Sequence, residues 1–320
     1  MEENTEQRVD LTLFSEKIQE LKDRIASVIV GQEQTVDLVL TAILANGHVL
    51  IEGVPGVAKT LLARLTARLI DADFSRVQFT PDLMPSDVLG TTVFNMKTNG
   101  FDFHQGPIFA DIVLVDEINR APAKTQAALF EVMEERQISI DGTTHRMGDL
   151  YTILATQNPV EQEGTYKLPE AQLDRFLMKI TMDYPSLEEE VNILERHHTN
   201  AALVKLDDIT PAITKEELLS LRAFMNQVFV DRTLLQYIAL IVQQTRTSKA
   251  VYLGASPRAS VAMLQSSKAY ALLQGRDFVT PEDIKFVAPY VLQHRLILTA
   301  EAEMEGYSPV KVTQRLIDKV

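Results

Sequence analysis

The segment from Gly53 to Thr60, with the sequence GVPGVAKT, limits the possible folds of this chain more than any other feature. It follows a short apolar segment at 48–52, HVLIE, and precedes a stretch of helical periodicity at 60–70. A glycine-rich loop between a strand and a helix is the setting of a phosphate-binding loop, in which backbone N–H groups and the positive end of the helix face the phosphates. The sequence therefore predicts a nucleotide-binding α/β domain.

Individual residues of this loop have separate expected roles. Lys59 is expected to contact the β- and γ-phosphates of ATP, and Thr60 to ligate Mg²⁺. The usual G-x-x-x-x-G-K-[ST] pattern has Gly where Ala58 stands, so the strict pattern fails here. A glycine-rich turn that binds no nucleotide is the alternative. The residues expected to hold the nucleotide in this segment are Gly53, Val54, Pro55, Gly56, Val57, Ala58, Lys59, Thr60 and Leu61.

Two carboxylates follow a second apolar segment, IVLV at 112–115. Because ligands of open α/β sheets bind at the carboxyl ends of the strands, Asp116 and Glu117 are expected close to the phosphate loop. Asp116 is predicted to hold Mg²⁺ through water, and Glu117 to orient and polarise the attacking water. An ordinary acidic strand end is the alternative, but the phosphate loop two strand–helix units upstream favours a catalytic pair.

A third apolar segment, YTILA at 151–155, ends in a neutral polar run that contains Asn158. Its side chain could hydrogen-bond the nucleophilic water or the γ-phosphate. Asn158-Pro159 is also a common turn pair, so a simple turn remains the alternative at this position.

Alternating strand and helix patterns predict a parallel sheet that is covered on both faces. Strands are expected at 48–52, 76–79, 112–115 and 151–155, and helices at 14–29, 36–44 and 60–70. Two segments instead alternate polar and apolar residues around Asn99-Gly100 and Asp141-Gly142, pairs that tolerate the positive φ of hairpin turns. We therefore expect β-hairpin insertions at 92–104 and 137–146.

Strand patterns nearly vanish after Pro185. Helices are expected at 187–198, 214–229, 231–248, 257–274 and 281–293. The chain is thus predicted to contain a flexible N-terminal segment at 1–13, a nucleotide-binding αβα domain at 14–184 and an all-helical domain at 185–320.

The three motifs, their order and their spacing resemble those of the AAA+ ATPases, and longer phrases resemble the MoxR family within that class. These phrases are GVPGVAKT, DEINRAPAKTQAALFEVMEE, ATQNPVEQEGTYKLPEAQLDRF and SPRAS. The resemblance runs from about residue 14 to residue 300. It implies a P-loop αβα domain with a parallel sheet and two hairpin insertions, followed by a helical lid domain, and it implies ATP hydrolysis.

The resemblance also implies roles for further residues. Gly31 and Gln32 match the segment that lies near adenine, and Asn158 matches the position called sensor 1. Arg175, in LDRF, matches the arginine finger, which acts on ATP held by the neighbouring subunit, and Arg258, in SPRAS, matches sensor 2. Guanidinium groups stabilise charge on a transferring phosphoryl group. A plain helix break at Gly31 and surface ion pairs at the two arginines are the alternatives.

The resemblance to the MoxR family implies a chaperone-like role with a protein client. If Arg175 acts on the ATP of a neighbouring subunit, an oligomeric ring follows, usually a hexamer in AAA+ proteins. Remodelling of the client, metal insertion and a partner with a von Willebrand factor A domain are further implications of the resemblance. Arg120, directly after the carboxylate pair, is a candidate for the subunit interface. The two hairpins are expected to contact the client.

The 320-residue chain has a net charge of −13 and no cysteine, and its histidines lack metal-ligand spacing. An acidic surface and few basic residues in the hairpins argue against nucleic acid, although an AAA+ nucleic-acid motor stays an alternative function. A second alternative function is a nucleotide-gated scaffold with little turnover. Ala58 supports this alternative, and the pair of Asp116 and Glu117 argues against it. The chain shows no signal-peptide pattern and no long apolar run, which predicts a cytoplasmic protein that does not insert into membranes.

Overall fold

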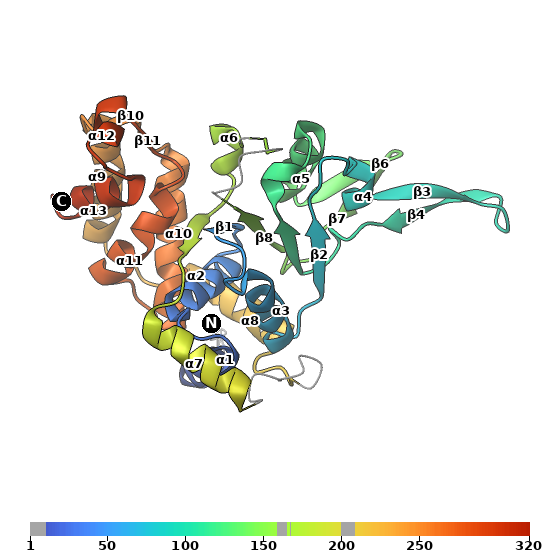
Figure 1. Ribbon diagram of the computed structural model, residues 1–320, viewed down its shortest axis with the longest axis horizontal. Coiled ribbons are helices and arrows are strands. Elements are labelled where there is room, and N and C mark those ends of the chain that lie inside the picture. Colours follow the sequence, from blue (N-terminus) through green and yellow to red (C-terminus); the bar gives the residue numbers. More distant parts are fainter. Residues whose placement is uncertain (1–10, 159–164, 167, 200–208) are drawn as a thin grey trace, which may run out of the picture.

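The computed structural model describes residues 11–158, 165–166, 168–199 and 209–320, and its centre is a five-stranded parallel sheet (Figure 1). The strand order is β2-β5-β8-β1-β9. The strands are β1 (Val49–Gly53), β2 (Phe74–Gln78), β5 (Ile112–Asp116), β8 (Thr152–Gln157) and β9 (Met178–Met182). Four of them confirm predicted strands to within a few residues. The fifth, β9, was not predicted; it forms one edge of the sheet beside β1.

Side chains of the sheet alternate between two hydrophobic cores, as expected for a sheet covered on both faces. Along β1, Val49 and Ile51 join one core and Leu50 joins the other. The first core includes α1 (Leu11–Val28), α2 (Glu33–Leu44) and α3 (Lys59–Leu69), and the second includes α5 (Ala123–Glu135). The predicted αβα arrangement is confirmed.

Both predicted hairpins are present as antiparallel pairs. The first consists of β3 (Gly90–Asn95) and β4 (Gly100–Gln105), and the second of β6 (Gln137–Ile140) and β7 (Thr143–Arg146). Their turns contain Asn99 at φ 48° and Asp141 at φ 50°, the backbone conformation that motivated the prediction. The β3–β4 pair extends from the body of the protein as a long arm (Figure 1). Its strand β3 follows α4 (Pro85–Leu89) without a connecting loop.

The chain after β9 is mainly helical. It contains α7 (Leu187–His198), α8 (Lys215–Phe224), η3 (Met225–Gln227), α9 (Arg232–Thr247), α10 (Pro257–Leu273), α11 (Pro281–Leu292), α12 (Ala300–Met304) and α13 (Pro309–Ile317). The all-helical expectation was wrong in one detail, because β10 (Val251–Leu253) pairs antiparallel with β11 (Ile297–Leu298). Figure 1 shows α9 to α13 grouped on one side of the sheet, whereas α7 and α8 lie close to α1 and α3.

Two short elements complete the described part of the chain, the 3-10 turn η1 (Ile118–Arg120) and α6 (Glu170–Leu173). No helix in that part has the length and apolar character needed to cross a membrane. Residues 1–10 of the predicted N-terminal segment and Pro159 of the predicted polar run lie outside the described residues.

Candidate nucleotide site

The phosphate loop connects β1 to α3, as predicted. Gly53 is the last residue of β1, and Lys59 is the first residue of α3. Gly56 has φ 90°, a conformation that L-residues rarely adopt. Ala58 caps the helix at φ 61° and ψ 23°, in the left-handed region. Ala58 stands where the usual pattern has Gly, and in this left-handed conformation Gly would be less strained than Ala.

Lys59 lies over its own loop, where its Nζ donates a hydrogen bond to the carbonyl oxygen of Gly53 at 2.6 Å. Partial burial lowers the pKa of Lys59, and this effect outweighs the opposite influence of the charges of Asp116, Glu117 and Glu52. The ammonium group has two further N–H donors beside the one directed to Gly53, and the negative charge of a nucleotide in the loop would favour the ionised lysine.

Asp116 ends β5 with its carboxylate directed toward the start of α3. The Oγ1 atom of Thr60 lies 3.5 Å from Asp116 Oδ2, and Thr156 Oγ1 donates to Asp116 Oδ1 at 2.6 Å. A hydroxyl next to a carboxylate is the oxygen donor set that suits Mg²⁺. Arg76 on β2 forms an ion pair with the same Oδ2 atom, with Nη2 at 2.7 Å and Nε at 2.9 Å. The residues present fit the predicted Mg²⁺, and Arg76 holds a positive charge beside them.

Glu117 is held from three sides. Its Oε2 atom accepts a hydrogen bond from Gln78 Nε2 at 2.8 Å and lies 2.9 Å from Arg120 Nε. Its backbone has φ 56°, and its N–H group donates to Thr156 Oγ1 at 3.0 Å. The Thr156 hydroxyl on β8 thus contacts both acids at the end of β5, because it accepts from the backbone of Glu117 while it donates to Asp116.

Asn158 lies at the same edge of the sheet as the phosphate loop. In the parallel pairing of β1 with β8, Glu52 is opposite Gln157, the residue before Asn158. The Asn158 side chain is buried. Gly31 and Gln32 form the turn between α1 and α2, where Gln32 Oε1 accepts a hydrogen bond from Thr35 Oγ1 at 2.9 Å.

Arg175 and Arg258 lie elsewhere. In the pairing of β1 with β9, Gly53 is opposite Met182 and Val49 is opposite Met178, so Arg175 precedes the amino end of β9. At about 3.3 Å per residue, the length of β1 alone separates that end from the phosphate loop by about 13 Å. The guanidinium group of Arg175 donates to the Phe130 carbonyl in the second half of α5.

The two arginines lie close to each other. Arg258 forms an ion pair with Glu134, and Arg175 Nε lies 3.8 Å from another oxygen of that carboxylate. Arg258 also approaches Asp174, the residue before Arg175, at 3.8 Å. Asp174 is in turn bonded at 2.6 Å to Arg295, which lies after α11. Both predicted arginines thus occupy one charged cluster at the amino edge of the sheet.

Comparison with known proteins places this geometry in a family. The chain is 47% identical over 298 residues to the uncharacterized protein YeaC of Bacillus subtilis, an alignment that covers 93% of this chain and 92% of the relative. It is 44% identical to chaperone MoxR1 of Mycobacterium tuberculosis, with 92% of this chain and 80% of the relative covered. The chain belongs to the MoxR family of AAA+ ATPases.

Domain profiles and a solved structure agree with this assignment. Residues 48–178 of the MoxR-family chain match the profile of the ATPase family associated with various cellular activities (AAA), and residues 243–318 match the AAA lid domain. A crystal structure from Cytophaga hutchinsonii, described as a candidate ATPase, superposes with a TM-score of 0.89 at 41% identity. That alignment covers 97% of this chain and 96% of the other. The MoxR-family protein is therefore an ATPase with an AAA+ domain and a helical lid domain.

Sequence reasoning missed three residues of the site in this MoxR-family ATPase: Arg76, Gln78 and Thr156. Two of them lie on β2 and one on β8, and each ends in a polar group at the carboxyl edge of the sheet. A signal was available for Thr156, which directly follows the apolar run of β8. No sequence pattern distinguished Arg76 and Gln78 from an exposed edge strand.

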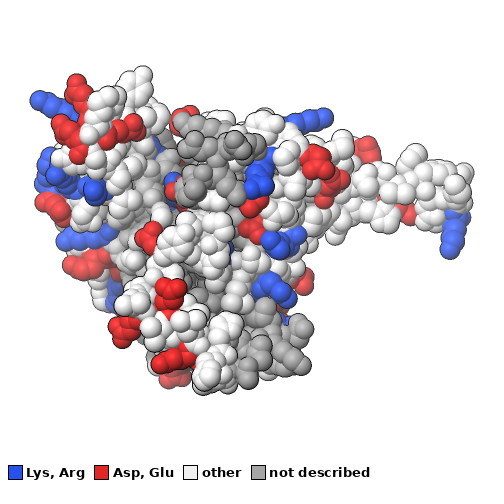
Figure 2. Space-filling view, viewed as in Figure 1, with Lys and Arg blue, Asp and Glu red and all other residues white. Residues whose placement is uncertain are grey.

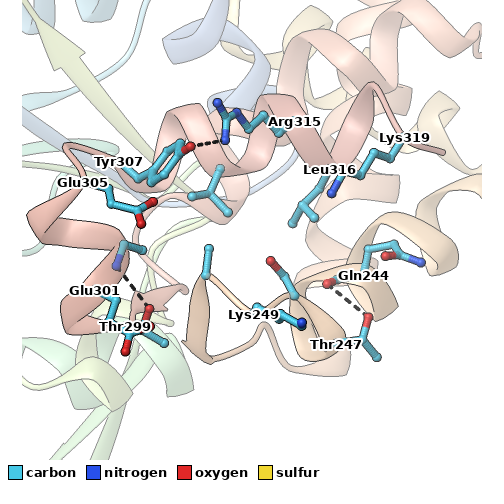
Figure 3. Close-up of a pocket in the computed structure, with 14 residues that line it drawn as sticks. Gln244, Thr247, Lys249, Thr299, Glu301, Glu305, Tyr307, Arg315, Leu316 and Lys319 are labelled. Carbon is cyan, nitrogen blue, oxygen red and sulfur yellow. Dashed lines mark hydrogen bonds between the residues drawn. The ribbon is translucent and has the colours of Figure 1, made fainter.

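One hollow of the lid domain is separate from the nucleotide site. It has a volume of about 530 Å³ and lies among α9, α12 and α13 (Figure 3). Tyr307 and Arg315 lie on one side of it, where the guanidinium carbon is 4.3 Å from the centre of the tyrosine ring, and Lys249 lies on another. None of the predicted site residues lines this hollow.

Proposed function

We propose that this MoxR-family ATPase works as a ring of identical subunits, in which the ATP held by one chain is completed by Arg175 and Arg258 of the next. The observation that carries the proposal is the register of β1 with β9, which separates Arg175 from the phosphate loop of its own chain by the full length of a strand. Arg258 lies beside Arg175 through the ion pairs that both form with Glu134. Because Arg175 and Arg258 share Glu134, both serve the same neighbouring nucleotide. A hexamer is the ring size usual for AAA+ proteins.

Within one chain, the residues of the carboxyl edge bind ATP and prepare the attacking water. Lys59 contacts the β- and γ-phosphates, while Glu117 and Asn158 orient water in line with the γ-phosphate. Thr60 and Asp116 hold Mg²⁺, which neutralises charge on the phosphates when it is bound. The reaction cleaves the terminal phosphoanhydride bond of ATP by water, giving ADP and phosphate without a covalent intermediate.

Further residues complete the binding site in the same proposal. The turn at Gly31 and Gln32 lies beside adenine, and the rest of the loop from Gly53 to Leu61 surrounds the phosphates through its backbone N–H groups. Arg120, which contacts Glu117, faces the subunit interface. The AAA+ and lid domains are proposed to span 14–184 and 185–320, and the N-terminal segment is shorter than the predicted 1–13 because α1 begins at Leu11. Hydrolysis is coupled to movement between neighbouring subunits.

The ring remodels protein clients in the cytoplasm. The β3–β4 arm supports this part of the proposal because it exposes large apolar side chains, at Met96 (89%), Phe101 (73%), Val93 (47%) and Phe94 (46%). Such side chains suit unfolded protein better than nucleic acid, and the only lysine or arginine of the arm is Lys97. A partner with a von Willebrand factor A domain and metal insertion into the client belong to the same proposal, by analogy with the family.

Complementation between two inactive variants tests the shared site. Arg175→Ala keeps the phosphate loop and Lys59→Ala keeps both arginines, so each protein alone is expected to lose most of its ATP turnover. In a mixture, an Arg175→Ala subunit supplies an intact phosphate loop and a neighbouring Lys59→Ala subunit supplies both arginines. That site is complete, and turnover is expected to return. Arg315→Ala, an exposed lid arginine bonded to Tyr307, is the matched control and keeps its activity. A mixture as inactive as its components contradicts the proposal.

A further inference from the structure

Helix α7 has three of its four large apolar side chains exposed to solvent. None of its residues is fully buried, and only Glu189, Ile193 and Arg196 are even partly covered. These three recur at spacings of four and three, so they lie on one face of the helix. The face of α7 that contacts the protein is therefore largely charged, whereas an amphipathic surface helix ordinarily turns its apolar stripe inward.

The charged face is fixed to the protein by specific contacts. Arg196 Nη1 donates to the carbonyl of Ser27 at 2.6 Å and to that of Ala26 at 3.2 Å, at the end of α1. Near the start of α7, the side chain of Glu189 packs so closely on Gly31 that a Cβ atom there would lie 2.1 Å from its Oε1. The orientation of α7 is thus set by contacts at both of its ends.

The opposite face is an apolar stripe open to solvent. Leu187 is 81% exposed, Leu194 is 64% exposed and Val191 is 47% exposed, at helical spacings of four and three. Tyr184, three residues before the helix, is 73% exposed. Single exposed apolar residues are common on protein surfaces, but a continuous row of this kind marks an interaction site. In Figure 2 the lower front of the protein, where α7 lies in Figure 1, shows uncharged surface between acidic side chains.

The position of the stripe relates it to the nucleotide site. Helix α7 follows the carboxyl end of β9, next to the phosphate loop in the sheet, and it packs on the Gly31 turn. The stripe therefore belongs to the edge of the protein that holds ATP. Exposed acids flank it at Glu188, Glu190 and Glu195.

A complementary patch surrounds Arg258 at the other edge. Tyr252 is 79% exposed, Leu253 is 50% exposed and Val261, one turn after Arg258 on α10, is 59% exposed. Leu253 lines a hollow of about 250 Å³ together with Asp174, which places this patch beside the arginine cluster. The exposed basic residues here are Arg246, Lys249 and Arg258, and exposed acids lie among them, at Glu170, which lines the same hollow, and at Glu134, which is paired with Arg258. The two surfaces thus match in apolar character, and Arg246 and Lys249 of the patch are opposite in charge to the acids that flank the stripe.

We propose that the α7 stripe of one subunit packs against the Tyr252 patch of the next copy of this chain, and that this contact holds the arginines over the neighbour's ATP. The inference rests on the proposed function, because the shared site already requires the arginine edge of one copy to meet the nucleotide edge of another. The contact is head-to-tail, since the stripe and the patch lie on different surfaces of one chain. A head-to-tail contact closes into a ring when its rotation allows.

The absence of cysteine makes the contact directly testable. Val191→Cys and Tyr252→Cys are each prepared as the only cysteine in the full chain and treated with a short bis-maleimide in the presence of ATP. We expect covalent dimers when the two proteins are mixed and none with either protein alone. Met96→Cys, at an exposed site on the β3–β4 arm, is the control and is expected to form no dimer with Val191→Cys.

A second variant separates this contact from the shared site itself. Replacing Leu187, Val191 and Leu194 by serine is expected to lower turnover at least tenfold at low protein concentration, with recovery as the concentration rises. If complementation between Arg175→Ala and Lys59→Ala succeeds but no mixed dimer forms, the shared site stands and the α7 contact is wrong. Dimers of Val191→Cys alone also overturn the head-to-tail contact. If the triple serine variant has unchanged turnover, the α7 stripe binds a different protein and not the next copy of this chain. Failure of complementation counts against the proposed function.

Discussion

Ala58→Gly is expected to stabilise the nucleotide-free protein, because residue 58 has φ 61°. An L-residue in the left-handed region costs about 1–2 kcal/mol. Glycine removes that cost but gives the unfolded chain about 0.4–1 kcal/mol of additional entropy. The difference is a net gain of about 0.8 kcal/mol in the free energy of unfolding. The backbone N–H of residue 58 is kept, so ATP binding is expected to persist.

Two neighbouring substitutions provide the controls. Gly56→Ala places a side chain at φ 90°, with no atom within 4 Å of the new Cβ, so its expected loss comes from backbone strain alone. That conformation is farther from the left-handed minimum, and the loss is expected to be at least about 1 kcal/mol. Gly142→Ala, at φ 78° in the second hairpin and equally free of contacts, repeats the strain away from ATP.

The assay is equilibrium urea unfolding without nucleotide, with the change in free energy taken from the midpoint and the slope. The expected order of midpoints is Ala58→Gly, wild type, then the two alanine variants. ATP affinity is expected to change for Gly56→Ala and not for Gly142→Ala. A lower midpoint for Ala58→Gly refutes the reasoning, because it means that the methyl group of Ala58 contributes more than its backbone costs.

Three further results are expected. Glu117→Gln is expected to bind ATP and to lose about 10²–10⁴-fold in turnover, as single-turnover kinetics would show, because the amide cannot polarise water. Chelation of Mg²⁺ is expected to abolish turnover in the wild type, and Asp116→Asn to raise the Mg²⁺ concentration needed for half-maximal activity; an unchanged Mg²⁺ dependence contradicts the assigned ligand. Burial lowers the pKa of His48 to about 3, so the unfolded chain takes up a proton below pH 6.5 that the folded chain does not. The free energy of unfolding is therefore expected to fall by about 2 kcal/mol more in the wild type than in His48→Gln between pH 6.5 and 5, and parallel pH profiles rule this out.

The predicted elements with strong local signals were the ones that the structure confirmed. The phosphate loop, the buried strand before Asp116 and the two hairpins each depend on residues adjacent in sequence. Strand β9 was missed because its five residues carry a weak pattern and its place is fixed by non-local pairing, including the ion pair of Lys179 with Glu52 at 2.7 Å. Pairing partners of this kind cannot be found from one segment alone.

The position of the arginines was beyond sequence reasoning for a related reason. Motifs placed Arg175 and Arg258 in the site, but only the parallel register of β1 and β9 shows which edge they occupy. The amphipathic pattern of α7 is likewise visible in the sequence, whereas the direction in which its apolar stripe points depends on the contacts of Arg196 with α1. In both cases the residue types and their local spacing were predictable from the sequence, but their position in the fold was not.

The β3–β4 arm is joined to the Asp116–Glu117 pair through two packed helices. Helix α5 follows Glu117 after a single 3-10 turn, and Thr125 near its start donates to the Leu83 carbonyl at 2.6 Å, just before α4. Helix α4 packs against α5 and continues directly into β3. Six residues of strand span about 20 Å, so a 10° rotation of α4 moves the end of the arm by roughly 3–4 Å. A small rearrangement around Glu117 would therefore be amplified along the arm to a displacement of about the length of one residue in an extended chain.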